Sequence, residues 1–202
     1  GANIDDIGKT IGLDPRIGKL FLNAGPGYGG SCLPKDMKAL INFAKASGIN
    51  PTLLNAVEEV NTKQLEQIIL MIKQKLGNLA SKKITILGTA FKPNTDDIRD
   101  SIAIELIKKL LNKKAKIIIH DPKAMKNTQR IFKEKINYAK TIEDALAKSQ
   151  CVIIMTQWKQ YEKLNNNQFK YMTRKFVIDC RRMLAKKQLD VDYYAIGLGK
   201  QN

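Results

Sequence analysis

The hydrophobic pattern of the chain changes at Lys82, and the pattern after this residue constrains the fold more than any other feature. Short β-rich runs alternate there with stretches of helical periodicity. The runs are 84–87, 117–119, 152–155 and 176–178, and the clearest helical stretches are 102–111 and 142–147. Continuous apolar runs are typical of parallel strands that are covered on both faces. The alternation of strand and helix therefore predicts right-handed βαβ units and a doubly wound α/β sheet.

The residues before Lys82 have the periodicity of helices instead. Isoleucines at helical spacing predict a helix over 4–11, which Gly12 ends. Asp14 and Pro15 predict the N-cap and first residue of a short helix that ends at Phe21. A glycine- and proline-rich segment, 24–30, follows and is too irregular for either helix or strand.

Two further helices are predicted in this first region. One has Pro34 in its first turn, and its apolar face is formed by Met37, Leu40, Ile41 and Ala44. The other begins at Asn50-Pro51 and keeps one apolar face to about Gly77. At 1.5 Å per residue it would span roughly 40 Å, long enough to bridge two domains or to form the core of a dimer. We therefore divide the chain into a helical region, 1–80, and an α/β domain, 81–202.

The formal net charge of +16 limits the choice of partners. A basic surface can bind nucleic acid, acidic lipid or a phosphate-bearing small molecule. However, aliphatic residues separate the lysines between 108 and 116, and no aromatic stacking platform accompanies them. This arrangement favours a solvated lysine-rich surface, so nucleic acid is not expected as a partner.

Other classes of protein are excluded by hydropathy and by cysteine content. No apolar run approaches the roughly 20 residues that a membrane-spanning helix needs, so no membrane partner is expected. The three cysteines lack metal-ligand spacing, and a single histidine leaves little for a zinc site or a catalytic triad. We expect a reduced, cytoplasmic compartment and no metal.

Polar and cationic residues gather after the predicted strands, where ligands bind in doubly wound sheets. These segments are 88–97, 121–122, 156–158 and 179–182. The first of them lacks a full G-x-G-x-x-G pattern, so it offers no backbone cradle for a pyrophosphate. Lys92 and Arg99 could instead hold a diphosphate through their side chains, although Arg99 could also pair with a neighbouring aspartate.

The segment 29–36 places Cys32 at the start of a predicted helix. The positive end of the helix dipole and the Lys35 cation both favour a thiolate, which is the nucleophilic form of cysteine. Asp36 follows Cys32 by four residues, which is one helical turn, on the same face. Cys32 is therefore either a nucleophile or, alternatively, a half-buried and inert cysteine in a tight turn.

Four motifs in the same order resemble the dehydrogenases that oxidise a UDP-sugar to a UDP-uronic acid, the UDP-glucose/UDP-N-acetylmannosamine dehydrogenase family. Gly27-Tyr28-Gly29-Gly30-Ser31-Cys32-Leu33-Pro34-Lys35-Asp36 is similar to the family's catalytic cysteine segment, and 13–18 to the stretch ahead of it. Residues 88–99 are similar to the signature that opens the UDP-binding domain, and 179–182 to a late Asp-Gly-Arg motif, with Cys180 in place of glycine. The resemblance covers nearly the whole chain.

The resemblance implies a four-electron oxidation that uses two NAD⁺ at one site. The C6 alcohol of UDP-glucose would become an aldehyde, then a thiohemiacetal and a thioester on Cys32, and finally the carboxylate of UDP-glucuronate. The implied roles divide the site residues into catalytic, NAD-binding and substrate-binding groups. Asp36 would position the hydrolytic water beside the catalytic Cys32, Lys35 and Arg99 would contact NAD, and the substrate would be held by Arg16 (from the partner subunit), Phe21, Asn23, Gly25, Tyr28, Gly29, Phe91, Lys92 and Arg181.

The resemblance also implies how the whole protein is organised. The fold would be a helical dimerisation segment with a long connecting helix, followed by a Rossmann-like doubly wound parallel sheet. We expect a homodimer with the helix after Pro51 in its core. The family's N-terminal NAD-binding domain is not in this sequence, so we expect the C-terminal part of a longer enzyme. Such a part would need the missing domain, or a partner chain that carries it, for turnover.

Two alternatives to UDP-glucose oxidation remain open. The substrate could be UDP-N-acetylmannosamine or another UDP-N-acetylhexosamine, although Met155-Thr156-Gln157-Trp158 resembles the corresponding segment of UDP-glucose enzymes more closely. The chain could also be a non-catalytic module for UDP-sugar binding or dimerisation, which would use the same cations without turnover.

Overall fold

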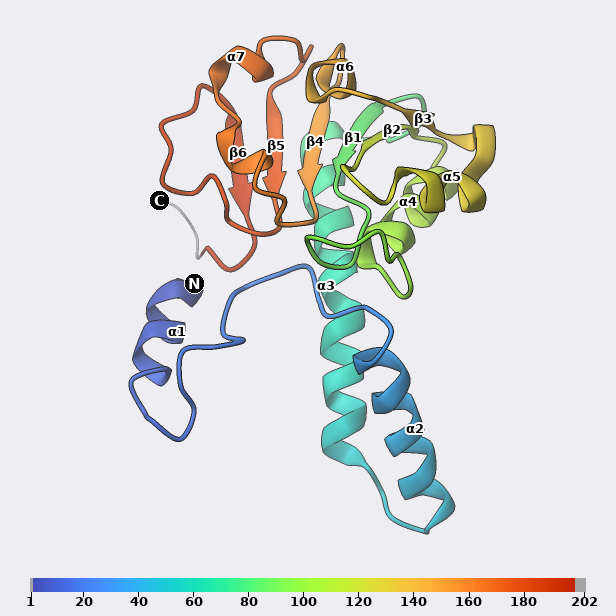
Figure 1. Ribbon diagram of the computed structural model, residues 1–202, viewed down its shortest axis with the longest axis vertical. Helices are drawn as coiled ribbons and strands as arrows, with labels where there is room; N and C mark the ends of the chain where they lie inside the picture. Colours follow the sequence, from blue (N-terminus) through green and yellow to red (C-terminus); the bar gives the residue numbers. More distant parts are fainter. Residues whose placement is uncertain (1, 199–202) are drawn as a thin grey trace.

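A six-stranded, entirely parallel sheet organises the second part of the chain in the computed structural model, which describes residues 2–198 (Figure 1). The strands are β1 Lys83–Leu87, β2 Lys116–His120, β3 Asn137–Tyr138, β4 Cys151–Ile154, β5 Phe176–Asp179 and β6 Asp192–Ala195. Their spatial order is β3-β2-β1-β4-β5-β6, and each neighbouring pair is parallel. The strand order changes direction between β1 and β4, which confirms the predicted doubly wound sheet.

Seven α-helices accompany the sheet within the described residues. They are α1 Ile4–Ile11, α2 Leu33–Ala46, α3 Thr52–Leu76, α4 Ile102–Asn112, α5 Met125–Phe132, α6 Ile142–Leu146 and α7 Asn166–Phe169. Short 3₁₀ turns cover Lys133–Lys135 and Tyr161–Lys163. The helices predicted over 4–11, from Pro34 and from Pro51 to Gly77 are confirmed, as are the four predicted strands. The described helices include none that is both long and apolar enough to span a membrane.

The sheet is covered on both faces, as its apolar strands require. Alternate residues point to opposite faces of a strand. Ile84 and Ile86 of β1 therefore pack into a core with α3 and α4, whereas Leu87 packs into a second core with α6, Trp158 and the 3₁₀ turn at Tyr161. The carboxyl ends of the strands stay free of helices and lie toward α1 and the middle of α3 (Figure 1).

Helix α3 connects the sheet to a helical hairpin. Its C-terminal half is buried in the core of the sheet through Leu65, Ile68, Ile69, Ile72 and Leu76. Its N-terminal half projects beyond the sheet with α2 beside it (Figure 1). The apolar face predicted along the whole helix is therefore covered over only part of its length. Leu53 is 77% exposed and Val60 is 58% exposed, and Leu40 on α2 is 51% exposed.

The prediction of a short helix from Pro15 to Phe21 is wrong. Residues 14–18 form a single turn in which the backbone N–H groups of Ile17 and Gly18 both donate to the carbonyl oxygen of Asp14. The Asp14 carboxylate accepts from the backbone N–H of Arg16 at 2.9 Å, which is an Asx turn rather than a helix cap. Gly18 and Phe21 both have positive φ angles, 73° and 62°, and a helix cannot continue through such residues.

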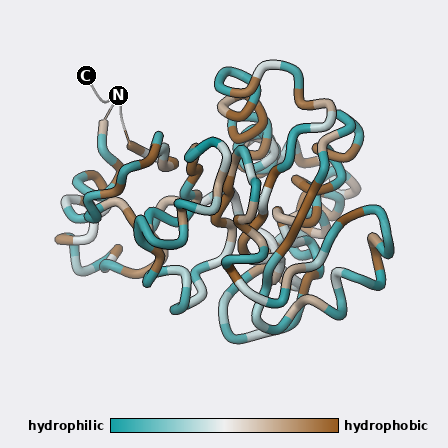
Figure 2. Tube along the Cα trace, turned by 90° about the horizontal axis from the view of Figure 1, so that it is seen from above, coloured by the Kyte–Doolittle hydropathy of each residue, from teal (hydrophilic) through white to brown (hydrophobic). Residues whose placement is uncertain are grey.

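The beginning and the end of the described chain lie against each other. The Ile4 N–H donates to the carbonyl oxygen of Gly197 at 2.9 Å. Arg182, which follows β5, donates from Nη2 to Asn3 Oδ1 at 3.0 Å and to Asp5 Oδ2 at 2.7 Å. Figure 2, which looks down on the molecule, shows hydrophobic residues on this outlying N-terminal segment as well as within the sheet. The α1 segment is thus held at the carboxyl end of β5 and β6.

Candidate functional site

Cys32 is exposed at the N-terminus of α2, where its carbonyl oxygen accepts the N–H of Asp36 at 2.8 Å. Its Sγ lies 3.6 Å from the Ser31 hydroxyl and forms no cap hydrogen bond to the helix. Pro34 in the first turn favours a helix start at this point. The thiol therefore faces solvent at the positive end of a fourteen-residue helix.

Two cations are within electrostatic range of this sulfur, one from each part of the chain. Lys35 belongs to α2, and its pKa is raised by its hydrogen bond to Asp36, by the charge of Asp36 and by the charge of Cys32. Arg99 belongs to the loop after β1, and its pKa is raised by its hydrogen bonds to Asp97, by the charge of Asp97 and again by Cys32. The Arg99 side chain is 71% exposed and bidentate on Asp97, with Nη2–Oδ2 at 2.7 Å. The pairing of Arg99 with an aspartate, which the sequence left open, is thus present, and Arg99 is also within electrostatic range of Cys32.

The glycine loop, residues 24–30, packs directly against the loop after β1. A Cβ atom on Gly30, whose φ is 95°, would lie 2.6 Å from the ring of Phe91. A Cβ atom on Gly29 would collide with the carbonyl oxygen of Asp100. These two glycines are therefore required by close approach, and the contact joins the helical region to the sheet domain next to Cys32.

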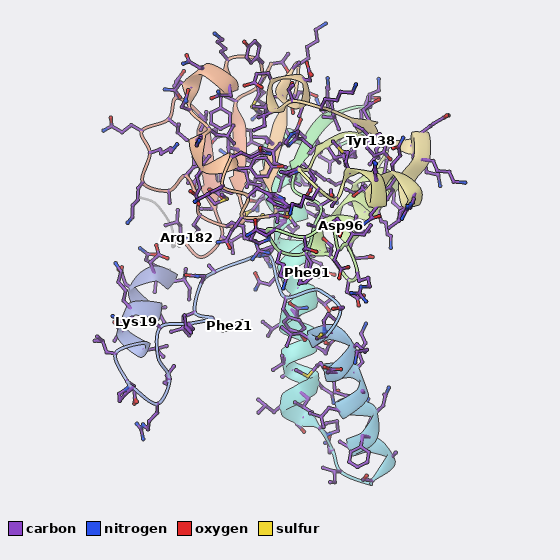
Figure 3. All side chains as sticks on the ribbon, viewed as in Figure 1. Lys19, Phe21, Phe91, Asp96, Tyr138 and Arg182 are labelled. Atoms are coloured by element: carbon purple, nitrogen blue, oxygen red, sulfur yellow. The ribbon has the colours of Figure 1, made fainter. Side chains whose placement is uncertain are left out.

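Phe91 and Lys92 follow β1 at the carboxyl end of the sheet (Figure 3). The Lys92 amino group lies 5.3 Å from the centre of the Phe91 ring, within cation–π range. Phe91 is half-buried and Lys92 is exposed. They offer an apolar surface and an exposed cation side by side.

Arg181 completes this side of the site from the loop after β5. Its Nε donates to the carbonyl oxygen of Met155 at 2.8 Å, and burial lowers the pKa of its guanidinium. A Cβ atom on Gly25 would lie 2.7 Å from Arg181 Nη1. A narrow pocket here is lined by Pro26, Gly27, Gly29, Ala90, Phe91, Ser101, Ile102, Ala103, Met155 and Arg181. It lies between the glycine loop and the ends of β1 and β4, where the strand order changes direction.

Two buried aspartates shape the loops that carry these residues. Asp121, at the end of β2, accepts hydrogen bonds from the backbone N–H groups of Thr89 and Ala90 at 2.7 and 3.0 Å. Asp179, at the end of β5, accepts from the N–H of Arg181 at 3.0 Å, and burial raises the pKa of its carboxyl group. The sequence places both aspartates at the end of a predicted strand, but it does not show whether they bind a ligand or, as here, accept hydrogen bonds from the loop backbone.

Tyr28 is turned toward α3. Its hydroxyl donates to Glu58 Oε1 at 2.7 Å, and its backbone N–H donates to Asn61 Oδ1 at 2.7 Å. Burial, the bond to Glu58 and the charge of Glu58 raise the pKa of Tyr28 to about 12. Neither Glu58 nor Asn61 was predicted from the sequence, although two polar side chains three residues apart on an amphipathic helix can mark a shared contact.

Three predicted substrate residues are not gathered around Cys32 within the described part of the chain. Arg16 is 88% exposed and bidentate on Asp14. Phe21 is 97% exposed and lies on the segment that connects α1 to the glycine loop (Figure 3). Asn23 is exposed and lines a separate open groove between α1 and Lys186.

A metal centre is not formed by residues 2–198, which contain no group of three or more His, Cys, Asp or Glu side chains suited to holding an ion.

Comparison with known proteins agrees with this geometry. Residues 85–186 match the UDP-glucose/GDP-mannose dehydrogenase family, UDP binding domain, and residues 1–63 match the central domain of the same family. The chain is 40% identical over 196 residues to UDP-glucose 6-dehydrogenase AglM of Haloferax volcanii, covering 97% of this chain and 45% of that protein. It is 33% identical to UDP-glucose 6-dehydrogenase TuaD of Bacillus subtilis, covering 98% of this chain and 44% of that protein.

The fold resembles solved structures of such enzymes. A UDP-glucose dehydrogenase from Pyrobaculum islandicum superposes with a TM-score of 0.89 at 33% identity, over 98% of this chain and 44% of that chain. A UDP-D-ManNAc dehydrogenase from Pyrococcus horikoshii shares the fold with a TM-score of 0.79 at 22% identity, over the same shares. The chain thus spans less than half the length of the curated relatives it matches. It belongs to the UDP-glucose/GDP-mannose dehydrogenase family and comprises its central and UDP-binding domains.

Proposed function

We propose that this chain supplies the cysteine nucleophile and the UDP-binding surface of a UDP-glucose 6-dehydrogenase, which oxidises UDP-glucose to UDP-glucuronate. The observation that carries the proposal is the position of Cys32, exposed at a helix N-terminus beside Lys35 and Arg99, with its loop packed on Phe91. The names of the relatives from Haloferax volcanii and Bacillus subtilis support the choice of substrate.

Cys32 would act after the first of two oxidations at C6. Loss of a hydride and a proton converts the alcohol to an aldehyde. The Cys32 sulfur adds to the carbonyl carbon and the carbonyl oxygen takes a proton, which gives a thiohemiacetal. Loss of a second hydride and the hydroxyl proton gives a thioester. Water then adds to the thioester carbon, the C–S bond breaks, and the carboxylate and the free thiol are released. The covalent bond retains the reactive aldehyde and orients it for the second oxidation.

Lys35 and Arg99 fit the anionic part of a dinucleotide cofactor. NAD⁺, the cofactor we propose, supplies the hydride acceptor, one molecule for each oxidation. Both side chains are largely exposed, 69% and 71%. Lys35 pairs with the exposed Asp36, and such a pair is weak, so a phosphate can replace the carboxylate. Arg99 is bidentate on Asp97, which is only 18% exposed, so a phosphate would share this guanidinium with Asp97 rather than replace it. Asp36, one turn after Cys32, would then be available to position the hydrolytic water.

The UDP moiety would lie at the carboxyl end of the sheet. Phe91 offers an apolar face, and Lys92 and Arg181 are cations suited to a diphosphate. Gly25, Tyr28 and Gly29 would line the sugar side of the site. Tyr28 would contribute its ring surface there, because Glu58 engages its hydroxyl and Asn61 engages its backbone N–H and carbonyl groups. The Asn23 and Phe21 contacts remain part of the proposal, on the exposed segment that leads into the glycine loop.

The same proposal includes a homodimer and a separate NAD-binding domain. Exposed apolar residues on the hairpin of α2 and α3, including Leu53 and Val60, are suited to a subunit interface. Arg16, exposed on its turn, would then reach the site of the partner subunit. The three cysteines are free, which suits a reducing compartment such as the cytoplasm. Chemical cross-linking and sedimentation test the dimer. Assays with UDP-glucose and NAD⁺ should show no steady NADH formation until a polypeptide with the NAD-binding domain is added.

Protection of the thiol tests the assignment of the site. Native protein is alkylated with iodoacetamide in the presence of UDP, UDP-glucose or UDP-N-acetylmannosamine, and the label is located by mass spectrometry. We expect Cys32 to be labelled and UDP-glucose to slow its labelling more than UDP does. Protection by none of the three would refute the proposal. Protection by UDP-N-acetylmannosamine alone would instead assign the chain to that substrate.

A further inference from the structure

Helix α3 holds the glycine loop through one asparagine side chain. Asn61 Oδ1 accepts the backbone N–H of Tyr28 at 2.7 Å, and Asn61 Nδ2 donates to the carbonyl oxygen of Tyr28 at 3.2 Å. A primary amide is suited to this task because it carries one acceptor and two donors. Both polar groups of a single loop residue are therefore satisfied by a side chain 33 residues further along the sequence.

Among the described residues, these are the two hydrogen bonds that the backbone of the glycine loop forms. Within residues 2–198, no other hydrogen bond reaches a backbone N–H or carbonyl group of residues 24–30. The loop is rich in glycine, so its unrestrained backbone would sample many conformations. Asn61 thus provides the polar restraint on a segment that has no regular structure of its own.

The loop also fits closely around this asparagine. A Cβ atom on Gly27, whose φ is 115°, would lie 2.6 Å from Asn61 Oδ1. One helical turn earlier, Glu58 accepts the Tyr28 hydroxyl at 2.7 Å. Glu58 and Asn61 lie on one face of α3, three residues apart, and together contact the backbone and the side chain of Tyr28.

The position of Cys32 depends on the contacts that hold the glycine loop, because the Cys32 side chain forms few contacts of its own. The sulfur is exposed, it lies within hydrogen-bond distance of the adjacent Ser31 hydroxyl at 3.6 Å, and it makes no cap hydrogen bond. Its direction therefore follows from the backbone that leads to it, which is held by Asn61 at Tyr28 and by Phe91 at Gly30.

We infer that Asn61 is a positioning residue, which fixes the glycine loop so that the sugar of the bound nucleotide meets Cys32. The inference rests on the proposed function for its substrate but not for the loop contact itself. Asn61 touches neither Cys32 nor the pocket beside Arg181, so its effect would pass through Tyr28.

The test uses the whole chain with Asn61→Leu, which removes both bonds, and Asn61→Asp, which keeps the acceptor for the Tyr28 N–H but loses the donor. Asn55→Leu is the matched control, because Asn55 is exposed on the same helix. Hydrogen exchange of residues 27–31 reports the loop. Alkylation of Cys32 with UDP or UDP-glucose reports the site, and calorimetric titration with UDP reports binding to the sheet domain.

We expect Asn61→Leu to speed exchange of the Tyr28 amide by about tenfold, which corresponds to the loss of a typical hydrogen bond. UDP affinity should stay within about twofold, whereas the additional protection of Cys32 by UDP-glucose over UDP should be lost. Asn61→Asp should leave exchange of the Tyr28 amide within about twofold and reduce the protection, and Asn55→Leu should change neither. If Asn61→Leu does not fold, the protection measured for Asn61→Asp decides.

Two results would overturn the inference in different ways. Unchanged exchange and unchanged protection in Asn61→Leu would show that the loop does not depend on Asn61. Faster exchange of the loop in Asn61→Leu, together with no protection of Cys32 by UDP-glucose in the native chain, would leave the contact real and refute the proposed function, and with it the role of Asn61 toward the sugar.

Discussion

Asp121→Asn replaces a buried carboxylate by an amide of nearly the same shape and should cost about 2–6 kcal/mol of unfolding free energy. Asp121 is 3% exposed and accepts five hydrogen bonds. Oδ1 accepts the N–H groups of Lys123 and Ala124, and Oδ2 accepts those of Thr89 and Ala90 and the indole of Trp158.

An asparagine can present only one oxygen to these donors. In its better orientation the amide nitrogen replaces Oδ1, so the two backbone N–H groups bound to Oδ1 lose their acceptor. In the opposite orientation three donors would lose theirs, namely two backbone N–H groups and the Trp158 indole. Each buried donor left unpaired costs about 1–3 kcal/mol, and the lower part of the summed range applies where the loop can relax toward water. The N–H groups of Thr89 and Ala90, in the turn before Phe91, keep their acceptor in this orientation. The free energy of UDP binding should therefore change less than the free energy of unfolding.

Urea unfolding followed by circular dichroism measures the difference, with Asp190→Asn as the control. Asp190 is 80% exposed and pairs with Lys175 on the surface, so its substitution should change the unfolding free energy by less than about 1 kcal/mol. An Asp121→Asn variant as stable as the Asp190→Asn control would refute the view that this carboxylate organises the loops at the carboxyl end of the sheet.

Three further predictions concern the thiol, a tyrosine and the docking of α1. Cys32→Ser, in an enzyme completed with the NAD-binding domain, should abolish UDP-glucuronate formation measured by chromatography, and formation at the parental rate would exclude a covalent role. The pKa of Tyr28 is raised to about 12 in the folded protein, so the unfolded tyrosine ionises first as the pH rises from 10 to 12, and this ionisation lowers the unfolding free energy. Tyr28→Phe removes this group, so the variant should lose less unfolding free energy between pH 10 and pH 12. Identical pH profiles of the two proteins in urea unfolding would contradict this prediction. Asp5→Ala should cost about 1–3 kcal/mol, because it deprives the 7% exposed Arg182 side chain of its charged partner, whereas Arg182→Met should cost less than about 1 kcal/mol. Thermal unfolding in which Arg182→Met is the less stable of the two would contradict the prediction.

The sequence was informative about the sheet because its central strands are fully buried. The runs 117–119, 152–155 and 176–178 are continuous apolar segments, as burial on both faces favours. The run 84–87 is interrupted only by Thr85, whose buried hydroxyl donates to the carbonyl oxygen of Ala145. The edge strands β3 and β6 were not predicted. β3 has only two residues, and β6 begins with the exposed Asp192 and contains two half-buried tyrosines.

The sequence signal for a short helix after Asp14 failed because the backbone takes positive φ angles within the predicted range. Asp14-Pro15 is a favourable helix start, but Gly18 and Phe21 adopt positive φ angles that end the turn at once. The residues around Cys32 were identifiable from their motif, whereas the support of the loop was not. Asn61 meets Tyr28 only because α3 and the glycine loop are packed together, and no spacing rule connects residues 33 positions apart.

Helix α3 is anchored in the hydrophobic core up to one turn before it reaches Asn61. Leu65 is the buried core residue nearest to Asn61 on this helix, and the two lie about 6 Å apart along the helix axis, at 1.5 Å per residue. A tilt of roughly 10° about Leu65 would displace Asn61 by about 1 Å, and a misplacement of about 1 Å is enough to slow a reaction substantially. The packing around Leu65 therefore limits how far the glycine loop and Cys32 can shift, and a methyl-sized cavity at this position should reduce activity although it lies away from the reacting atoms.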